Sequence, residues 1–456
     1  MNDALLEHYR AHQQANLDGL FELLRIPSIS ALPAHRGDVR RAAEFLAADL
    51  TKMGMESVRL IEGNGHPIVY ADWLHAPGKP TLVLYGHYDV QPPDPLDEWL
   101  SPPFEPTVRD ENVYARGAVD DKGQTYLILK AVEGLMAVEG KLPVNVKFLI
   151  EGEEETDGGV LRDWLTENGS GLGADAALIC DTEMFAPGLP TITTGLRGMV
   201  YAEIEVRGPR SDLHSGMYGG VAPNPFQGLA QILCGLKAPD GRVLIPGFYD
   251  DVEEPSAAEQ EAWAKLPFDE EQLCKHEVGA KALVGEPGRS PLHRIWARPT
   301  FEIHGMPGGF TGEGAKTVIP AKATAKVSTR LVPAMDPDKV AAALKAAVAD
   351  LEPEGMTATT RILGKAPASL SSTDSVYVRK AAEAMEQSFG RRTVYQRSGG
   401  SIPVVGLLQE KAGVPSVMMG FGLPDDNLHA PNEKFHLPNF YAGIETVGRY
   451  LSLLGE

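Results

Sequence analysis

The chain has 456 residues, and 62 Asp and Glu against 42 Lys and Arg give it a formal net charge of −20. At roughly 150 residues per domain, this length predicts two or three domains. Nucleic acids and anionic membranes are bound through clusters of Lys and Arg. The acidic balance of this chain argues against both as main partners. We therefore expect no nucleic acid and no membrane among its partners.

No run in the sequence approaches the 18 or so apolar residues that a membrane span needs. Residues 1–20 are polar and amphipathic, without the basic and apolar regions of a secretory signal. The three cysteines, Cys180, Cys234 and Cys274, form neither a disulfide framework nor a Cys-x-x-Cys metal motif. These features predict a cytoplasmic protein.

The first part of the chain alternates between helical and strand patterns. Predicted helices, with apolar residues at helical spacing, are 2–25, 38–54 and 122–138. Predicted buried strands are the apolar runs 80–87, 144–151 and 174–181. This alternation predicts an α/β fold with a mixed, mostly parallel sheet and helices on both faces. In such sheets, functional groups collect at the carboxyl ends of the strands.

The pattern changes after residue 195. Segments 199–208 and 322–333 alternate apolar and polar residues, as antiparallel strands with one solvated face do. Helices are predicted at 225–236 and 336–351 within the same region. After it the α/β pattern returns, with a helix at 374–389, a strand at 414–421 and a helix at 438–454. We therefore predict an α/β domain made of residues 1–195 and 366–456, interrupted by an inserted α+β domain at 196–365.

Several predicted strands end in acids or histidines. In GHYDV, His87 and Asp89 lie two residues apart, so in an extended segment both side chains point to one face. A metal-bound imidazole usually donates its other N–H to a carboxylate, which makes His87 a candidate ligand and Asp89 its partner. A loop histidine beside a solvated aspartate is the alternative, and this pair alone does not exclude it.

Two further segments are rich in carboxylates. Asp120 and Asp121 begin the helix predicted at 122–138, where acids also occur simply as helix caps. The run EGEEE follows the strand predicted at 144–151, and a solvated charged face is the ordinary interpretation of such a run. Its position favours a site instead, because strand ends in α/β folds line clefts, where crowded carboxylates need a cation.

The last candidates are Asp181, which ends another apolar run, and two histidines of a polar loop, His429 and His436. Together the segments offer histidines and carboxylates from separate strand ends, a ligand set suited to zinc or manganese. His436 stays an alternative to His429 on these grounds.

The order of these motifs resembles that of the two-metal aminopeptidase-like superfamily, which contains carnosinases and other cytosolic dipeptidases, acetylornithine deacetylase, succinyl-diaminopimelate desuccinylase and glutamate carboxypeptidase. The motifs are GHYDV, ARGAVDDKG, EGEEE, a Cys-Asp pair after an apolar strand, DLHSG, GAKTVIP with STRLVP, SGGSIP and LHAPNEK. The resemblance covers about residues 80–437. It is greatest to carnosinase-like dipeptidases, which carry D-D-K-G where the deacylases usually show D-M-K-G and have a longer inserted lid.

Position by position, the resemblance implies two divalent metal ions per subunit, zinc or manganese. His87 and Asp181 would bind one ion, Glu155 and His429 the other, and the carboxylate of Asp120 would bridge the two. The resemblance also implies that the peptide bond between Asp120 and Asp121 is cis. Two divalent ions bring four positive charges and the three carboxylates three negative charges, so a bridging hydroxide, the expected nucleophile, would complete the balance.

The resemblance also implies the groups that act on the substrate. Glu154 would be the general base, taking a proton from water and returning it to the leaving amine, and Asp89 would orient His87. His214, on the lid of a homodimer partner, would stabilise the oxyanion, and Arg330 would bind a substrate carboxylate. The remaining positions that would line the substrate site are Thr317, Gly400, Ser401 and His429.

The sequence thus predicts a cytoplasmic metallo-dipeptidase, a homodimer through its inserted lid, that cleaves dipeptides or other short peptides with a free carboxylate. A deacylase of N-acyl amino acids that uses the same metals is the nearest alternative. A catalytically inactive binding protein and a serine hydrolase are alternatives of other classes. The intact ligand set with Glu154 argues against the first, and HSGM is not the G-x-S-x-G elbow of the second.

Overall fold

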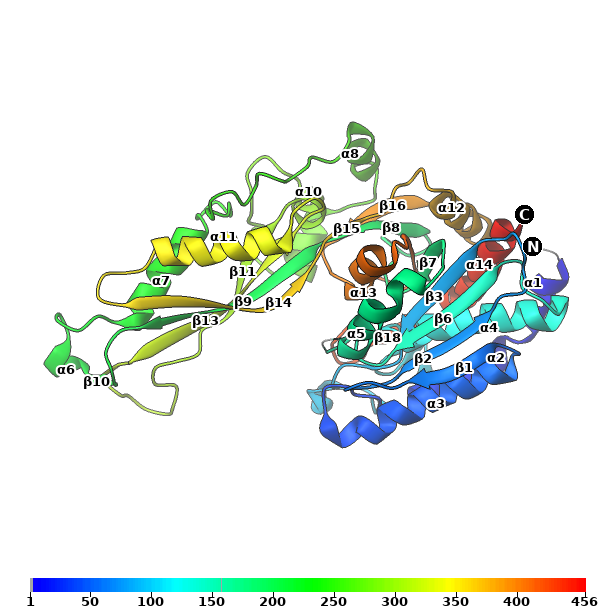
Figure 1. Ribbon diagram of the computed structural model, residues 1–456, viewed down its shortest axis with the longest axis horizontal. Helices are drawn as coiled ribbons and strands as arrows, with labels where there is room; N and C mark the ends of the chain where they lie inside the picture. Colours follow the sequence, from blue (N-terminus) through cyan, green and yellow to red (C-terminus); the bar gives the residue numbers. More distant parts are fainter. Residues whose placement is uncertain (1–2, 157) are drawn as a thin grey trace. The chain divides into compact units, whose positions relative to one another are not determined.

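The computed structural model describes residues 3–156 and 158–456 of the chain (Figure 1). It divides into two compact units. The first consists of Met1–Thr194, Ser371–Gln396 and Ile402–Glu456, and the second of Gly195–Leu370 and Arg397–Ser401. The second unit thus includes the short segment Arg397–Ser401, which lies far along the chain from the rest of that unit.

A large mixed sheet, most of which belongs to the first unit, has the strand order β1-β2-β6-β3-β7-β17-β8-β15, with β16 also paired to β8. Its strands are β1 (Glu56–Ile61), β2 (Ile68–Trp73), β3 (Thr81–His87), β6 (Asn145–Glu151), β7 (Ala176–Ile179), β8 (Thr191–Leu196), β15 (Ser369–Leu370), β16 (Val394–Ser398) and β17 (Ser416–Gly420). The mixed α/β fold class is confirmed. Parallel pairing joins the four central strands β6, β3, β7 and β17, whereas β1, β2, β8 and β15 pair antiparallel.

Helices cover both faces of this sheet, because its strands bury side chains on either side (Figure 1). In β3, Leu82 and Leu84 point into the core that α4 and α14 close, whereas Val83 and Tyr85 point to the opposite face. On that face Trp164 of α5 packs against Tyr70 of β2. The helices of the first unit are α1 (Asp3–Ala11), α2 (Gln13–Leu24), α3 (Arg36–Lys52), α4 (Lys122–Glu139), α5 (Gly159–Asn168), α12 (Val376–Phe389), α13 (Pro403–Leu407) and α14 (Leu437–Gly455).

A small three-stranded sheet of the first unit brings two distant loops together. It consists of β18 (Lys434–His436), β5 (Asn112–Tyr114) and β4 (Thr107–Arg109), in that order. Because β18 pairs with β5, the loop before β18, which carries His429, lies beside the segment between β5 and α4, which carries Asp120.

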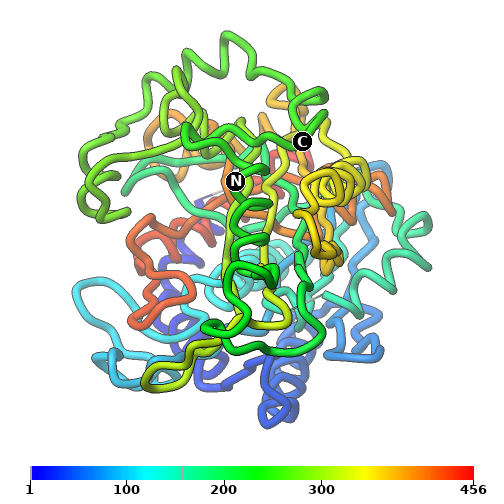
Figure 2. Tube along the Cα trace, turned by 90° about the vertical axis from the view of Figure 1, so that its left-hand side faces the viewer, coloured from blue at the N-terminus to red at the C-terminus, as the bar shows by residue number. Residues whose placement is uncertain are grey.

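The second unit is an α+β structure. Its antiparallel sheet has the order β11-β13-β9-β14, and α7 and α11 pack on one face, as neighbouring green and yellow helices in Figure 2. Val200, Ala202 and Ile204 of β9 are buried under these helices, whereas the alternate residues Tyr201 and Glu203 are partly exposed, as the period-two pattern predicts. The elements of this unit are β9 (Gly198–Arg207), β10 (Leu213–His214), α6 (Ser215–Tyr218), α7 (Pro225–Leu236), α8 (Ala257–Ala264), α9 (Glu270–Gln272), α10 (Pro291–Ala297), β11 (Thr300–Gly305), β12 (Val318–Ile319), β13 (Lys322–Leu331), α11 (Pro337–Asp350) and β14 (Thr357–Ala366).

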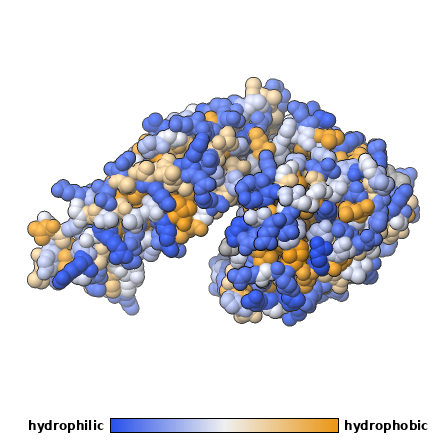
Figure 3. Space-filling view, in the orientation of Figure 1, coloured by the Kyte–Doolittle hydropathy of each residue, from blue (hydrophilic) through white to orange (hydrophobic). Residues whose placement is uncertain are grey.

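The structure refines the predicted elements at some ends. The helix predicted at 2–25 is two helices, α1 and α2, which meet at His12, where the backbone leaves the helical region. Within the described ranges, every helix is too short or too polar to cross a membrane. The molecular face in Figure 3 accordingly carries mostly hydrophilic side chains, with apolar ones in small groups.

Candidate metal centre

The end of β3 places a buried histidine and aspartate beside each other. His87 is the last residue of β3, and both His87 and Asp89 are fully buried. His87 Nδ1 lies 3.1 Å from the Asp89 carbonyl oxygen and 3.4 Å from Asp89 Oδ1. A Nδ1–H that donates to Asp89 leaves the Nε2 lone pair free to bind a cation, which is the usual second contact of a metal-binding histidine.

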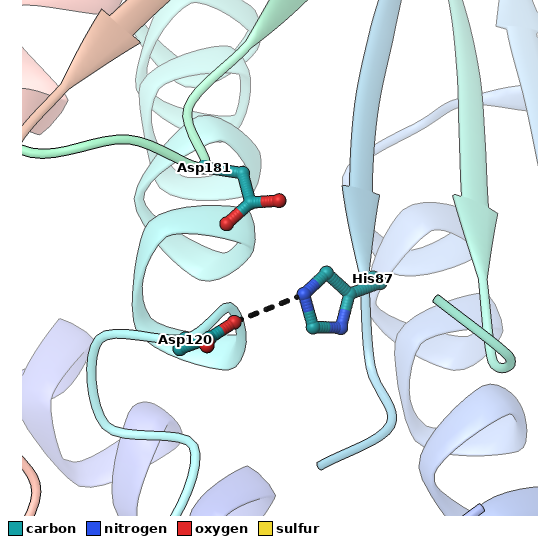
Figure 4. Close-up of side chains that lie close together, drawn as sticks. All are labelled: His87, Asp120 and Asp181. Carbon is teal, nitrogen blue, oxygen red and sulfur yellow. Dashed lines mark hydrogen bonds and ion pairs between the residues drawn. The ribbon is translucent and has the colours of Figure 1, made fainter. Parts of the chain in front are cut away.

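Two carboxylates lie close to the His87 ring, one just before a helix and one just after a strand. Asp120 lies two residues before α4, and its Oδ1 is 3.2 Å from His87 Nε2. Asp181 follows β7, and Figure 4 shows its carboxylate directed toward the other two side chains. One ligand atom of each of the three residues lies within 4.8 Å of the others. Two carboxylates and one imidazole at this spacing match the donors that zinc and manganese prefer.

A second group of the same kind shares Asp120. His429 Nε2 lies 2.9 Å from Asp120 Oδ2 and 3.2 Å from Glu155 Oε1, and ligand atoms of these three residues also lie within 4.8 Å of one another. Asp120 therefore turns one oxygen to His87 and the other to His429. A carboxylate that is shared in this way is placed to bridge two cations.

The electrostatics of the cluster favour cation binding. Burial raises the pKa of Asp121 to about 8 and that of Asp181 well above its usual range. Burial lowers the pKa of His87, but hydrogen bonds to Asp120 and Asp89 outweigh it and hold the pKa well above its ordinary value. Hydrogen bonds to Asp120 and Glu155 raise the pKa of His429 to about 10. A divalent cation would displace these protons, because it stabilises the ionised carboxylates and the neutral imidazoles, which are the forms that bind metals.

Asp89 also fixes the turn that carries the two glutamates. Its Oδ1 accepts a hydrogen bond from the backbone N–H of Glu154 at 3.2 Å, and its Oδ2 accepts one from Glu155 at 3.1 Å. The Ser30 hydroxyl donates to the same Oδ2 at 2.6 Å. Asp89 thus couples the orientation of His87 to the position of both glutamates.

The other residues singled out from the sequence belong to the second unit. His214 of β10 is exposed, and the next residue, Ser215, donates its N–H to the carbonyl oxygen of Thr317 at 3.1 Å. Arg330 of β13 donates from Nη1 to the Ser401 hydroxyl at 2.8 Å, and Gly400 lies next to that serine. The structure therefore joins these residues into two pairs of segments, 214 with 317 and 330 with 400–401.

A family comparison identifies the chain. Residues 83–453 match the model of "Peptidase family M20/M25/M40". The chain belongs to this family. It is accordingly a metallopeptidase, and it is 34% identical to Cys-Gly metallodipeptidase dug1 of Schizosaccharomyces pombe, over 96% of this chain and 95% of that protein.

Solved structures of family members match 96% or more of the chain. Human carnosine dipeptidase 1 is 28% identical, with a TM-score of 0.86 over 100% of this chain and 99% of that one. The M20 family metallo-carboxypeptidase Sso-CP2 of Sulfolobus solfataricus is 35% identical, also with a TM-score of 0.86, over 96% of this chain and 99% of that one. The expected resemblance to carnosinase-like relatives is confirmed.

A buried carboxylate that no sequence motif singled out, Glu433, holds the candidate metal centre together. Glu433 accepts hydrogen bonds from Arg116 Nη1 at 2.8 Å and from the backbone N–H groups of Gly117, Val119 and Asp120 at 2.9–3.1 Å. It lies four residues after His429, so one side chain ties the loop of Asp120 to the loop of His429. The motif LHAPNEK contains Glu433, but nothing in that motif indicates its partners.

Asp121 and His436 lie near the candidate ligands but belong to neither ligand group. Asp121, which the sequence left as a possible cap, accepts hydrogen bonds from the His87 N–H at 3.1 Å and the Thr125 hydroxyl at 2.7 Å, and its peptide bond to Asp120 is cis. His436, the alternative to His429, lies 3.2 Å from Asn439 at the start of α14 and belongs to neither ligand group.

Proposed function

We propose that this chain hydrolyses the peptide bond of dipeptides and other short peptides with a free C-terminal carboxylate. The observation that carries the proposal is the shared aspartate, because Asp120 joins two groups of three ligands, and a two-metal site suits hydrolysis. Relatives that match almost the whole chain are named Cys-Gly metallodipeptidase and carnosine dipeptidase, which favours short peptides as substrates.

We propose that the two groups hold a pair of divalent cations, zinc or manganese. His87, Asp120 and Asp181 would hold one ion, and Asp120, Glu155 and His429 the other. When bound, such a pair lowers the pKa of a water molecule and stabilises negative charge on oxygen in the transition state. The three carboxylates offset three of the four positive charges.

Glu154 is the proton carrier in this proposal. Its backbone is fixed by Asp89, and it directly precedes the ligand Glu155, so its carboxylate stays next to the reacting groups. There it takes the proton from the attacking water and returns it to the nitrogen of the leaving amine. A single carboxylate can do both, because the proton it gains in the first step is the one that the amine needs.

The second unit supplies the substrate contacts. Arg330 binds the carboxylate of the substrate through its guanidinium fork, with the 400–401 segment beside it, and Thr317 lines the substrate site next to the segment of His214. His214, which is exposed, stabilises the oxyanion in the active site of a partner subunit, so the working form is a homodimer. The three cysteines, which form no disulfide framework, support a cytoplasmic location.

A substrate panel tests the proposal. Purified protein is loaded with zinc or with manganese and assayed on cysteinylglycine, β-alanylhistidine and alanyl dipeptides, and on N-acetyl and N-succinyl amino acids. We expect hydrolysis of dipeptides, loss of activity in EDTA and recovery with the native metal, which elemental analysis of protein purified without added metal identifies. A strong preference for the acyl amino acids would assign a deacylase instead, and activity in EDTA would rule out the metal mechanism.

A further inference from the structure

Two arginines of the second unit share one short loop. Arg197 lies between β8 and β9, and its N–H and Nε donate to the carbonyl oxygens of Gly400 and Gly399, both at 3.0 Å. The Ser401 hydroxyl donates to the carbonyl oxygen of Arg197 at 2.5 Å and accepts from Arg330 Nη1 at 2.8 Å. The loop 399–401 therefore holds both side chains in one place.

Neither guanidinium has a carboxylate partner in the described part of the chain. This distinguishes the pair from the well-buried arginines of the structure, since Arg116 pairs with Glu433, Arg298 with Glu286 and Arg397 with Glu259. Two partly buried positive charges close together repel each other unless an anion joins them.

No neighbouring acid in the described part of the chain neutralises the positive charge of these two arginines. Burial, and then the charge of Arg330, lower the pKa of Arg197 to about 10, far below that of an ordinary guanidinium. The acid that acts on Arg197 most is Glu302, and its carboxylate is already bound to Lys237 Nζ at 3.0 Å. A Cβ at Gly399 would come within 2.9 Å of both Arg197 Nη2 and Ile295 Cγ2, so the glycine lets this guanidinium lie directly against the loop.

We propose that Arg197 is a specificity-determining residue, which with Arg330 forms an anion subsite for a peptide whose C-terminal residue carries two carboxylates. The inference rests on the proposed function, in which Arg330 binds the C-terminal carboxylate. That carboxylate offsets one of the two positive charges, and a side-chain carboxylate of Asp or Glu offsets the other. Each guanidinium fork matches one planar carboxylate.

Kinetics on a pair of isosteric substrates test the subsite. For the wild type, kcat/KM for alanyl-glutamate exceeds that for alanyl-glutamine by about tenfold or more, the scale of one charge-assisted hydrogen-bonded pair. Arg197→Gln retains a donor for the loop but not the charge, so we expect the preference to vanish through a higher KM for alanyl-glutamate alone. Equal losses on both substrates, or no preference in the wild type, would overturn the proposal.

The matched control is Arg361→Gln. Arg361 lies on the same sheet, but its side chain is 70% exposed and paired with Glu203, so this variant removes one positive charge without touching the subsite. It should retain the preference for alanyl-glutamate. Loss of the preference in this control would mean that overall charge, rather than Arg197, selects the substrate.

A binding measurement separates the inference from the proposed function. Calorimetry on the metal-loaded wild type should show tighter binding of L-glutamate than of L-glutamine, and Arg197→Gln should remove the difference. If this holds while no dipeptide is cleaved, the subsite stands and the proposed hydrolysis fails. If neutral dipeptides are cleaved but the two amino acids bind equally, the hydrolysis stands and the acidic specificity fails.

Discussion

Glu433 shows how one side chain can organise a candidate metal centre without belonging to either ligand group. It is fully buried, and its four donors include the N–H of Asp120 itself and the buried Arg116. The ligands of a metal site depend on such surrounding hydrogen bonds for their orientation. The carboxylate therefore sets the distance between Asp120 and His429 before any cation binds.

We expect Glu433→Ala to destabilise the first unit by about 3–5 kcal/mol, because it leaves the Arg116 charge buried and unpaired. Glu433→Gln, which keeps an oxygen for the backbone N–H groups, should cost less but weaken metal binding. Thermal unfolding and calorimetric metal titration measure the two effects. Asp426→Asn removes another buried acid of the same loop, one bound to Lys434 instead, and serves as the control. Equal metal affinity in Glu433→Gln and the wild type would contradict the positioning role.

At the level of the element, the end of β6 carries a buried acid outside the ligand groups. Glu151 is 4% exposed, and its Oε1 accepts a hydrogen bond from Tyr85 of the neighbouring strand β3 at 2.6 Å. Burial raises the pKa of Glu151 to about 7. The folded chain thus keeps this proton up to about pH 7, whereas the unfolded chain releases it near pH 4.5.

This difference predicts a pH dependence of stability. The contribution of Glu151 is fully present below about pH 4.5 and is lost as the pH rises through 7, by an amount on the order of 3 kcal/mol. Glu151→Gln should behave as the protonated form at every pH and so gain stability relative to the wild type between pH 5 and pH 8. Unfolding midpoints of both proteins across this range measure the gain. A constant difference between them would show that Glu151 does not titrate there.

The elements also show what sequence patterns can and cannot predict. The strands that end at His87, at Glu151 and just before Asp181 were predictable, because apolar runs that lead into a histidine or an acid are local features. The antiparallel outer strands and the break between α1 and α2 were not, since pairing direction and helix junctions depend on packing. The contacts of Glu433 join residues up to 317 positions apart, and no local pattern encodes such pairs.

At the scale of the whole molecule, the chain divides its tasks between two units. Every candidate metal ligand lies in the first unit, whereas His214, Arg330 and the second arginine, Arg197, lie in the second. The family match places this chain among metallopeptidases, and the proposed function raises the question of whether His214 acts in the active site of a partner subunit or in its own. The proposed homodimer makes that question testable.

Mixing two inactive variants tests whether His214 acts in the active site of the partner subunit or in its own. Glu154→Gln removes the proton carrier and His214→Ala the oxyanion contact, so each homodimer should be inactive. If His214 acts across a two-fold interface, a mixed dimer contains one site with both residues intact, and random exchange restores about a quarter of the sites. Activity assays after subunit exchange, with size-exclusion chromatography to confirm the dimer, measure the recovery. No recovery in a mixture that has demonstrably exchanged subunits would place His214 in the active site of its own subunit, because then every site still lacks one of the two groups.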